Sequence, residues 1–243
     1  MKKYIHPLKQ LKLRNLLWLS LIFCLGTKKM QAQIYTIGTG TTSSTTTGIS
    51  PFSTVWEDNR IQYLYLASEM AAAGMPPSNI LSIGFNITVL GNPNPTNVNI
   101  SIDTTSLTTL SSLQTGLTNV FSAATLTPTI GWNAYTCSAP FVWNGTNNIV
   151  VEVCRDNSSW SSGYGVEVSS VSNLTFGYYN DGVTGCSMTS GNTTSFTSRP
   201  NIQFNTIPLT PCSGKPIAGT TTPAGPLSTC IGGASVLTTT GYT

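Results

Sequence analysis

Apolar and polar residues alternate along residues 81–89, and this period of two constrains the fold more than any other feature. Its five apolar members occupy every second position: Leu81, Ile83, Phe85, Ile87 and Val89. Successive side chains of a β-strand point to opposite faces, so this spacing predicts a strand with all five on one buried face. Residues 98–102 repeat the pattern with Val98, Ile100 and Ile102.

Further short strands are predicted at residues 61–66, 119–126, 131–136, 148–154, 164–168, 175–179 and 200–204. Turn-forming residues separate several of them, as at 91–95 and 180–182. Only residues 67–73 have a helical pattern, which ends at Gly74. Because strands and helices do not alternate, the sequence predicts an all-β fold, an antiparallel β-sandwich resembling a jelly roll, with one short helix.

The N-terminal segment has a different character. Seven of the eleven basic residues lie within the first 29 positions, and an apolar run covers residues 16–26. Eleven helical residues rise only about 16 Å, roughly half of a bilayer core, which fits a secretory signal peptide better than a membrane span. We therefore expect residues 1–32 to be a signal peptide and the protein to be secreted or on the cell surface. No membrane span is expected in the mature chain.

The remaining chain is predicted to have three parts. Residues 33–206 form the β-sandwich module, and a proline-rich linker follows at 207–216. Residues 212–243 have the pattern of the opening strands of a second β-domain but are too short to complete it, because a sandwich typically takes about 100 residues. We expect the sequence to be the first part of a longer protein.

Charge excludes two classes of partner. Beyond the predicted signal peptide, four basic residues stand against eight acidic ones, a net charge of −4. The four are Arg60, Arg155, Arg199 and Lys215. So few scattered cations cannot neutralise a phosphate backbone or an anionic membrane, so we expect no nucleic-acid partner.

Catalysis is also not expected. The only histidine is His6, within the predicted signal peptide, so Ser-His-Asp and Cys-His mechanisms have no base. Paired carboxylates can hydrolyse glycosides, but the acidic side chains have simpler explanations. Glu152 and Glu167 are expected to face solvent or to pair with Arg60 or Arg155. Glu57 and Asp58 are expected to form an ion pair with Arg60 or a helix cap. The sequence predicts a non-enzyme without a cofactor, and the absence of CxxC spacing and of mature histidine excludes zinc.

Four stretches resemble a known family: residues 56–74, 131–136, 140–157 and 199–204. In this order they resemble the N-terminal β-sandwich module of large secreted cell-surface proteins of Bacteroidota, over roughly residues 34–206. The resemblance implies immunoglobulin-like, PKD-like or fibronectin-like repeats after the module, and export by the type IX system. It also implies a non-catalytic role in adhesion or structural spacing. The alternative is an accessory carbohydrate-binding module of a secreted hydrolase encoded further downstream.

Five cysteines lie beyond the predicted signal peptide, and in an exported protein they are disulfide candidates. They are Cys137, Cys154, Cys186, Cys212 and Cys230. We favour Cys154 with Cys186, because both lie at strand ends in stretches that resemble the family. Cys212 and Cys230 would pair within the second module, which leaves Cys137. A bridge between Cys137 and Cys154 is the rival pairing.

Tryptophans are the candidate ligand contacts, because their flat rings can stack on sugars. Of Trp56, Trp132, Trp143 and Trp160, the second and third adjoin apolar strands and are expected to pack in the core. Trp160 lies among small polar residues and, with Tyr164, is the predicted ligand platform, with surface glycans or other cell-surface proteins as partners.

Calcium is a further candidate ligand. Oxygens of Asp156, Asn180 and Asp181 could bind it, although turn formation explains residues 180–182 equally well.

Overall fold

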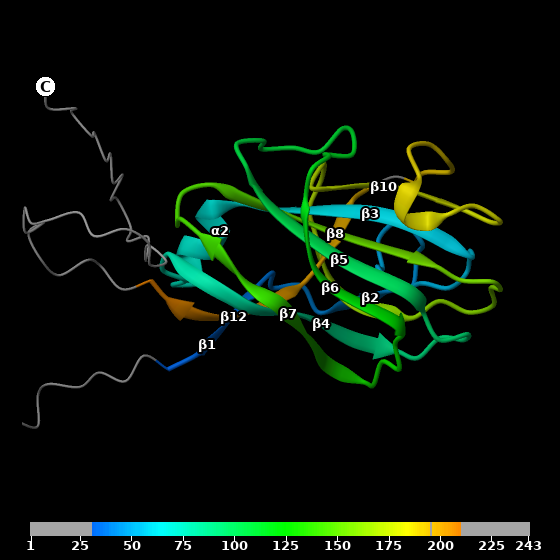
Figure 1. Cartoon of the computed structure of the whole chain (residues 1–243), viewed down its shortest axis with the longest axis horizontal. Helices are drawn as coiled ribbons and strands as arrows, with labels where there is room; N and C mark the ends of the chain where they lie inside the picture. Colours follow the sequence, from blue (N-terminus) through cyan, green and yellow to red (C-terminus); the bar gives the residue numbers. More distant parts are fainter. Residues whose placement is uncertain (1–30, 195, 210–243) are drawn as a thin grey trace, which may run out of the picture. The chain divides into compact units, whose positions relative to one another are not determined.

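The computed structural model describes residues 31–194 and 196–209, which form two packed β-sheets and one short helix (Figure 1). Every predicted strand is present, and so is the predicted helix, α2 (Ala67–Ala72). A short 3-10 helix, η1 (Gly185–Ser187), follows the tenth strand. The strands are β1 (Gln33–Ile37), β2 (Thr42–Ser44), β3 (Asp58–Tyr65), β4 (Ser78–Val89), β5 (Thr96–Thr105), β6 (Thr118–Thr125), β7 (Gly131–Trp143), β8 (Asn148–Asp156), β9 (Gly165–Ser170), β10 (Thr175–Asn180), β11 (Ser198–Pro200) and β12 (Ile202–Pro208).

The strand order confirms the predicted sandwich. One sheet has the order β10-β3-β8-β5-β6, and the other has the order β1-β12-β4-β9-β11, with β2 paired to β9 and β7 to β4. All pairings between these strands are antiparallel. From β3 to β10 the chain crosses between the sheets at every connection except β5 to β6, so that β3-β8-β5-β6 faces β2-β9-β4-β7. This connectivity is that of a jelly roll.

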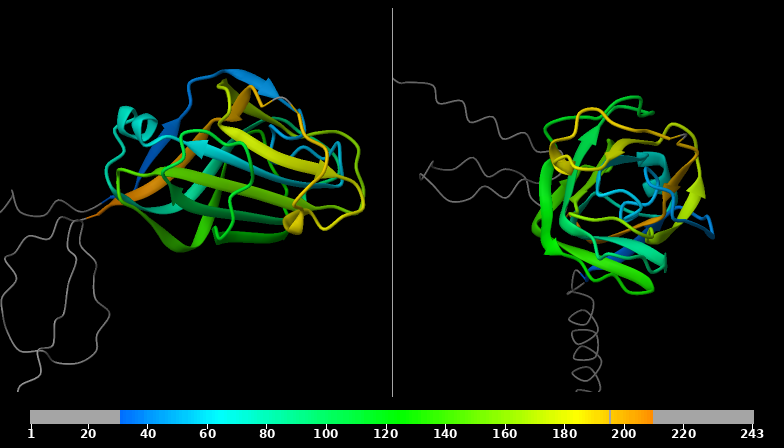
Figure 2. Two further views of the ribbon diagram at one scale, coloured as in Figure 1. Left: turned by 90° about the horizontal axis from the view of Figure 1, so that it is seen from above. Right: turned by 90° about the vertical axis from the view of Figure 1, so that its right-hand side faces the viewer.

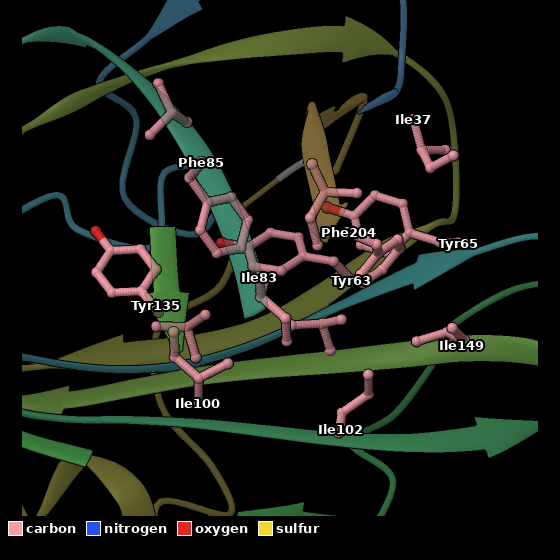
Figure 3. Close-up of a cluster of buried hydrophobic side chains, with 14 of the residues drawn as sticks. Ile37, Tyr63, Tyr65, Ile83, Phe85, Ile100, Ile102, Tyr135, Ile149 and Phe204 are labelled. Carbon is pink, nitrogen blue, oxygen red and sulfur yellow. The ribbon is translucent and has the colours of Figure 1, made fainter. Parts of the chain in front are cut away.

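The two sheets face each other in the end-on view of Figure 2, and the close-up in Figure 3 shows buried side chains of the core between them. Aromatic side chains of opposite sheets meet there edge to face: the rings of Tyr65 and Phe204 are 6.0 Å apart. Two buried hydroxyls of this core are satisfied, since Tyr65 donates a hydrogen bond to the carbonyl of Pro200 (2.9 Å) and Tyr63 donates to that of Ile49 (2.8 Å). Large rings can therefore fill the core without leaving these two hydroxyls unpaired.

The prediction that all five apolar residues of 81–89 share one buried face is wrong for two of them. The register of β4 against both neighbours skips Leu81, which has no partner in β7 or in β12. Such a bulge adds one residue and moves the following side chains to the other face. Ile83, Phe85 and Ile87 are buried, whereas Leu81 is half-buried and Val89 is 42% exposed.

The C-terminal boundary of the module differs from the prediction. Strand β12 runs through Pro208, and the amide of Leu209 donates a hydrogen bond to the carbonyl of Pro77 (2.9 Å). The first two residues of the predicted linker 207–216 are therefore strand residues. Residues 1–30 of the predicted signal peptide and residues 210–243, which include the rest of the linker after Leu209 and both Cys212 and Cys230, lie outside the described residues. Within the described part, no helix is long and apolar enough to cross a membrane.

The sandwich has two different ends. At the helix end, defined by α2 and by the paired residues Gln33 and Thr206, the chain enters β1 and leaves β12. At the loop end, defined by residues 50–57, 157–164 and 181–188, β3 begins while β8 and β10 end. The nine residues of β8 run between the two ends, a distance of about 30 Å at the rise of a β-strand.

Candidate functional site

A shallow cleft of about 230 Å³ opens at the loop end, lined by Val55, Trp56, Trp160 and Asp181. We call it the tryptophan cleft. Trp160 is 57% exposed and Val55 39% exposed. Trp56 is half-buried because its ring packs against that of Tyr179, with 5.3 Å between the centroids. The cleft thus joins one supported and one exposed indole, contributed by segments about 100 residues apart.

Arg155 holds the segment that carries Trp56. Its side chain, at the end of β8, is completely buried. It donates hydrogen bonds to the backbone carbonyls of Glu57 (2.6 Å), Trp56 (2.9 Å) and Ser53. Burial lowers the pKa of Arg155 to about 10, although Asp58 and Asp181 act in the opposite direction, so the guanidinium stays charged at neutral pH. One buried cation therefore fixes the backbone that leads into the cleft.

The segment carrying Trp160 is paired with the same loop. The amide of Ser161 donates to the carbonyl of Thr54 (2.9 Å), and the hydroxyl of Thr54 donates to the carbonyl of Ser162 (2.8 Å). Gly163 allows this close approach, because a Cβ there would overlap the hydroxyl of Ser53. These contacts hold the backbone beside Trp160 against the segment that carries Val55.

A third segment, after β10, supplies Asp181. The amide of Glu57 donates to Oδ1 of Asp181 (2.8 Å), and the amide of Gly182 donates back to Oε2 of Glu57 (2.9 Å). The disulfide between Cys154 and Cys186 ties the far side of this segment to β8. Gly185 beside it passes so close that a Cβ would overlap the carbonyl of Arg155. All three walls of the cleft are thus anchored to β8 or to one another.

The disulfide confirms the favoured pairing, and the rival bridge between Cys137 and Cys154 is wrong. Cys137 is a half-buried thiol without a bridge in the described part of the chain, and burial raises its pKa to about 11. It lies in β7, within the stretch opposite the bulge at Leu81.

Acidic residues gather at the loop end: Glu57, Asp58, Asp156 and Asp181 are four of the chain's eight. Asp58 is 1% exposed; its Oδ2 accepts the amide of Val183 (3.0 Å), while its Oδ1 has no hydrogen-bond partner. Burial raises the pKa of Asp58 to about 6, and the neighbouring Asp156 adds to this. Among the described residues, no group of three or more histidine, cysteine, aspartate or glutamate side chains could hold a metal ion, and the calcium site at Asp156, Asn180 and Asp181 stays a prediction.

The predicted platform needs a correction. Tyr164 is 2% exposed, and its hydroxyl donates to Oδ1 of Asn94 (2.6 Å), so its ring is part of the core and cannot receive a ligand. Trp143 is buried as predicted, whereas Trp132, also expected in the core, is 38% exposed. Nothing in the sequence distinguished Trp56, because its place beside Trp160 depends on contacts between distant segments.

A second cleft, of about 380 Å³, lies at the helix end between α2, β1 and the end of β9. Its one charged lining group, Glu69, is already engaged: it accepts hydrogen bonds from Arg199 at 2.7 and 2.9 Å and from the amide of Leu66 at 2.8 Å. Arg199 also stacks on the ring of Tyr65, 4.2 Å from its centroid. These contacts fasten α2 to the sandwich and give this cleft a structural role.

The partners predicted for the other acidic side chains are confirmed only for Glu152. Glu152 pairs with Arg60 at 2.9 Å, one of the partners expected for it. Glu167 instead accepts hydrogen bonds from the side-chain amides of Asn86 (3.1 Å) and Asn201 (3.2 Å). Glu57 and Asp58 do not pair with Arg60 or cap the helix, because both bind backbone amides of residues 182–183.

Comparisons of this chain with family models, with curated proteins and with solved structures found no match.

Proposed function

We propose that the sandwich is a non-catalytic adhesion module of an exported multidomain protein, with the tryptophan cleft as its contact surface. The observation that carries this proposal is the placement of the cleft. Two tryptophans lie at the loop end, opposite the end where the chain enters and leaves the sandwich. A module joined to its neighbours at one end has its other end free for a partner.

Rigidity of the cleft also supports a binding role. Its walls are held by Arg155, by backbone pairing of residues 53–54 with 161–163, and by the disulfide. A preformed surface binds with less loss of conformational entropy than a loose one. The disulfide, together with the basic and apolar N-terminal segment, supports export to an oxidising compartment.

The carboxyl groups favour binding over hydrolysis. Glycoside hydrolysis requires two carboxyl groups on either side of the bond that is cleaved, and Asp181 is the only carboxylate lining the tryptophan cleft. Glu57 and Asp58 bind the backbone amides of Gly182 and Val183, and Asp58 is also buried. The alternative, an accessory carbohydrate-binding module, rests on the exposed indole of Trp160, which offers a flat apolar face to a sugar ring.

The test is a comparison of three tryptophan variants of the whole chain, measured on immobilised glycans and purified extracellular proteins. Trp160→Ala is expected to abolish binding and to change the free energy of unfolding by no more than about 0.5 kcal/mol, since the ring is exposed. Trp132→Ala, the matched exposed control outside the cleft, keeps binding. Trp143→Ala is expected to lower the free energy of unfolding by about 3–5 kcal/mol as a buried ring is lost. Binding by Trp160→Ala that equals wild type would overturn the proposal.

A further inference from the structure

The charge at the loop end is strongly one-sided for a chain with so few charges. Four acidic residues lie there, of which Asp58 is buried, and Arg155 lies beneath the surface with its donors directed to backbone carbonyls and to the side chain of Asn157. Of the other arginines of the described residues, Arg60 pairs with Glu152 and donates to the carbonyl of Met188 (3.2 Å), and Arg199 pairs with Glu69. The surface around the tryptophan cleft is therefore complementary to a cation.

The residues that line the cleft indicate which class of cation it can bind. Two indoles and Val55 supply its walls, and Asp181 supplies its one charged group. Oδ1 of Asp181 already accepts the amide of Glu57, while its Oδ2 makes no hydrogen bond to the described residues. A strongly hydrated metal ion needs several oxygen ligands, which these walls lack. An organic cation with a flat face needs aromatic rings and a single carboxylate, which these walls supply.

We propose that the tryptophan cleft binds an arginine side chain of a basic segment in a partner protein, with the guanidinium against the indoles of Trp56 and Trp160 and paired to Asp181. This inference rests on the proposed adhesion function and names the partner. Cation–π attraction is strongest over tryptophan and is made more often by arginine than by lysine. A guanidinium also stacks on aromatic rings and donates two parallel hydrogen bonds to a carboxylate.

The size and polarity of the cleft favour this occupant over a sugar. A volume of about 230 Å³ holds one side chain, whereas sites for whole small ligands measure about 300–1,000 Å³. Recognition of a sugar requires several convergent polar groups for its hydroxyls, and this cleft offers one side chain. Glu57, next to Asp181, places a second carboxylate within reach of a neighbouring cation in the same segment.

The experiment is a titration of the whole chain, followed by tryptophan fluorescence, with a short blocked peptide that contains two arginines. The control peptide carries citrulline in place of arginine, which keeps the shape and removes the charge. We expect the arginine peptide to bind and the citrulline peptide to bind at least about tenfold more weakly. Equal affinity for both peptides would contradict the inference.

Two variants test the contacts. Trp160→Ala is expected to lower the affinity for the arginine peptide about tenfold. Asp181→Asn keeps the acceptor for the amide of Glu57. It is expected to lower the affinity for the arginine peptide about fivefold at low salt. The effect should be smaller at 1 M salt, because the Debye length falls to about 3 Å. Trp132→Ala and Asp103→Asn, which change the same residue types away from the cleft, leave the affinity unchanged. Wild-type affinity in Asp181→Asn at low salt would overturn the inference.

A glycan array on the same proteins separates the two proposals. If glycans bind through Trp160 while the arginine peptide does not bind, the inference about the partner fails and the adhesion module stands. If neither glycans nor proteins bind through Trp160, both proposals fail.

Discussion

Arg155 at the loop end and Arg199 at the helix end are both completely buried, yet their partners differ. Arg199 forms two hydrogen bonds to the carboxylate of Glu69, donates one to the backbone carbonyl of Leu64 and lies over the ring of Tyr65. Arg155 has only uncharged hydrogen-bond partners: the carbonyls of residues 53, 56 and 57 and the side chain of Asn157. The helix end therefore uses an ion pair to fasten one helix, whereas the loop end uses a single cation to organise an irregular loop.

The partners of a buried charge decide whether an apolar residue can replace it. A buried ion pair can often be replaced by apolar residues without loss of stability. A guanidinium that satisfies several backbone carbonyls has no apolar substitute, because buried carbonyls without donors are costly. The loop end is thus the part of the fold that depends most on one side chain, and it is also the part that carries the candidate site.

The largest expected effect comes from Arg155→Met. It leaves three backbone carbonyls without their donor, and we expect the free energy of unfolding to fall by about 3–5 kcal/mol. Arg199→Met is the comparison: it leaves one backbone carbonyl, that of Leu64, without its donor, while Glu69 is partly exposed and can turn to water, so the expected loss is about 2–3 kcal/mol. Urea denaturation of both variants measures the difference. If Arg199→Met were less stable than Arg155→Met, the conclusion that the fold depends more on Arg155 than on Arg199 would be wrong.

The next effect concerns the disulfide, which holds the loop end only. Cys154 and Cys186 are 32 residues apart, and opening a loop of this length costs about 3–4 kcal/mol in the chain-entropy account. The double variant Cys154→Ser, Cys186→Ser is expected to lose this amount in urea denaturation. Hydrogen exchange should become faster in residues 181–188 and stay unchanged in α2. Cys137→Ser, a control without a bridge, leaves both measurements near wild type, and faster exchange confined to α2 would count against the comparison.

The smallest effects have opposite dependence on pH at the two ends. Asp58 has its pKa raised to about 6 by burial and by Asp156, so the folded protein holds this proton more tightly than the unfolded chain. Wild type therefore loses stability as pH rises from about 4 through 6. Asp58→Asn removes this loss and is expected to be more stable than wild type by about 1–2 kcal/mol at pH 8, and equal to it at pH 4.

Glu69 provides the contrast at the helix end. Burial raises the pKa of its carboxyl, but the hydrogen bonds and charge of Arg199 outweigh burial and hold this pKa below the ordinary value. Its contribution is present above the pKa of the unfolded chain and is lost as pH falls through the folded pKa. Glu69→Gln is expected to lose about 1 kcal/mol at pH 7 and less at pH 3. Thermal unfolding of Asp58→Asn, Glu69→Gln and wild type at pH 3, 4, 7 and 8 tests this contrast. If the stability of both variants relative to wild type changed with pH in the same direction, the contrast would be contradicted.

The fold could be predicted from the sequence because its signals are local. Period-two alternation in segments such as residues 98–102 has one stable solution, a half-buried strand, and turn residues separate one strand from the next. The helix at Ala67–Ala72 was predicted for the same reason, since Gly74 ends it. Local pattern was misleading at Leu81, where a bulge defined by two neighbouring strands changes the phase of β4.

The candidate site could be predicted only in part. Trp160 was identified because small polar neighbours provide no core for a large ring. The same reasoning gave a wrong prediction for Tyr164, four residues later. Its hydrogen bond to Asn94 and its packing in the core depend on distant segments. Trp56 and Asp181 joined the site only through tertiary contacts.

By itself, therefore, the sequence determined the all-β class and the positions of the main strands, because these depend on residue type and on neighbours along the chain. The tertiary structure decided which carbonyls Arg155 binds, which residues 100 positions apart line one cleft, and where half of the acidic residues gather. Those outcomes depend on the pairing of β3, β8 and β10 at one end of the sandwich, and strand pairing between distant segments leaves no local pattern in a single sequence.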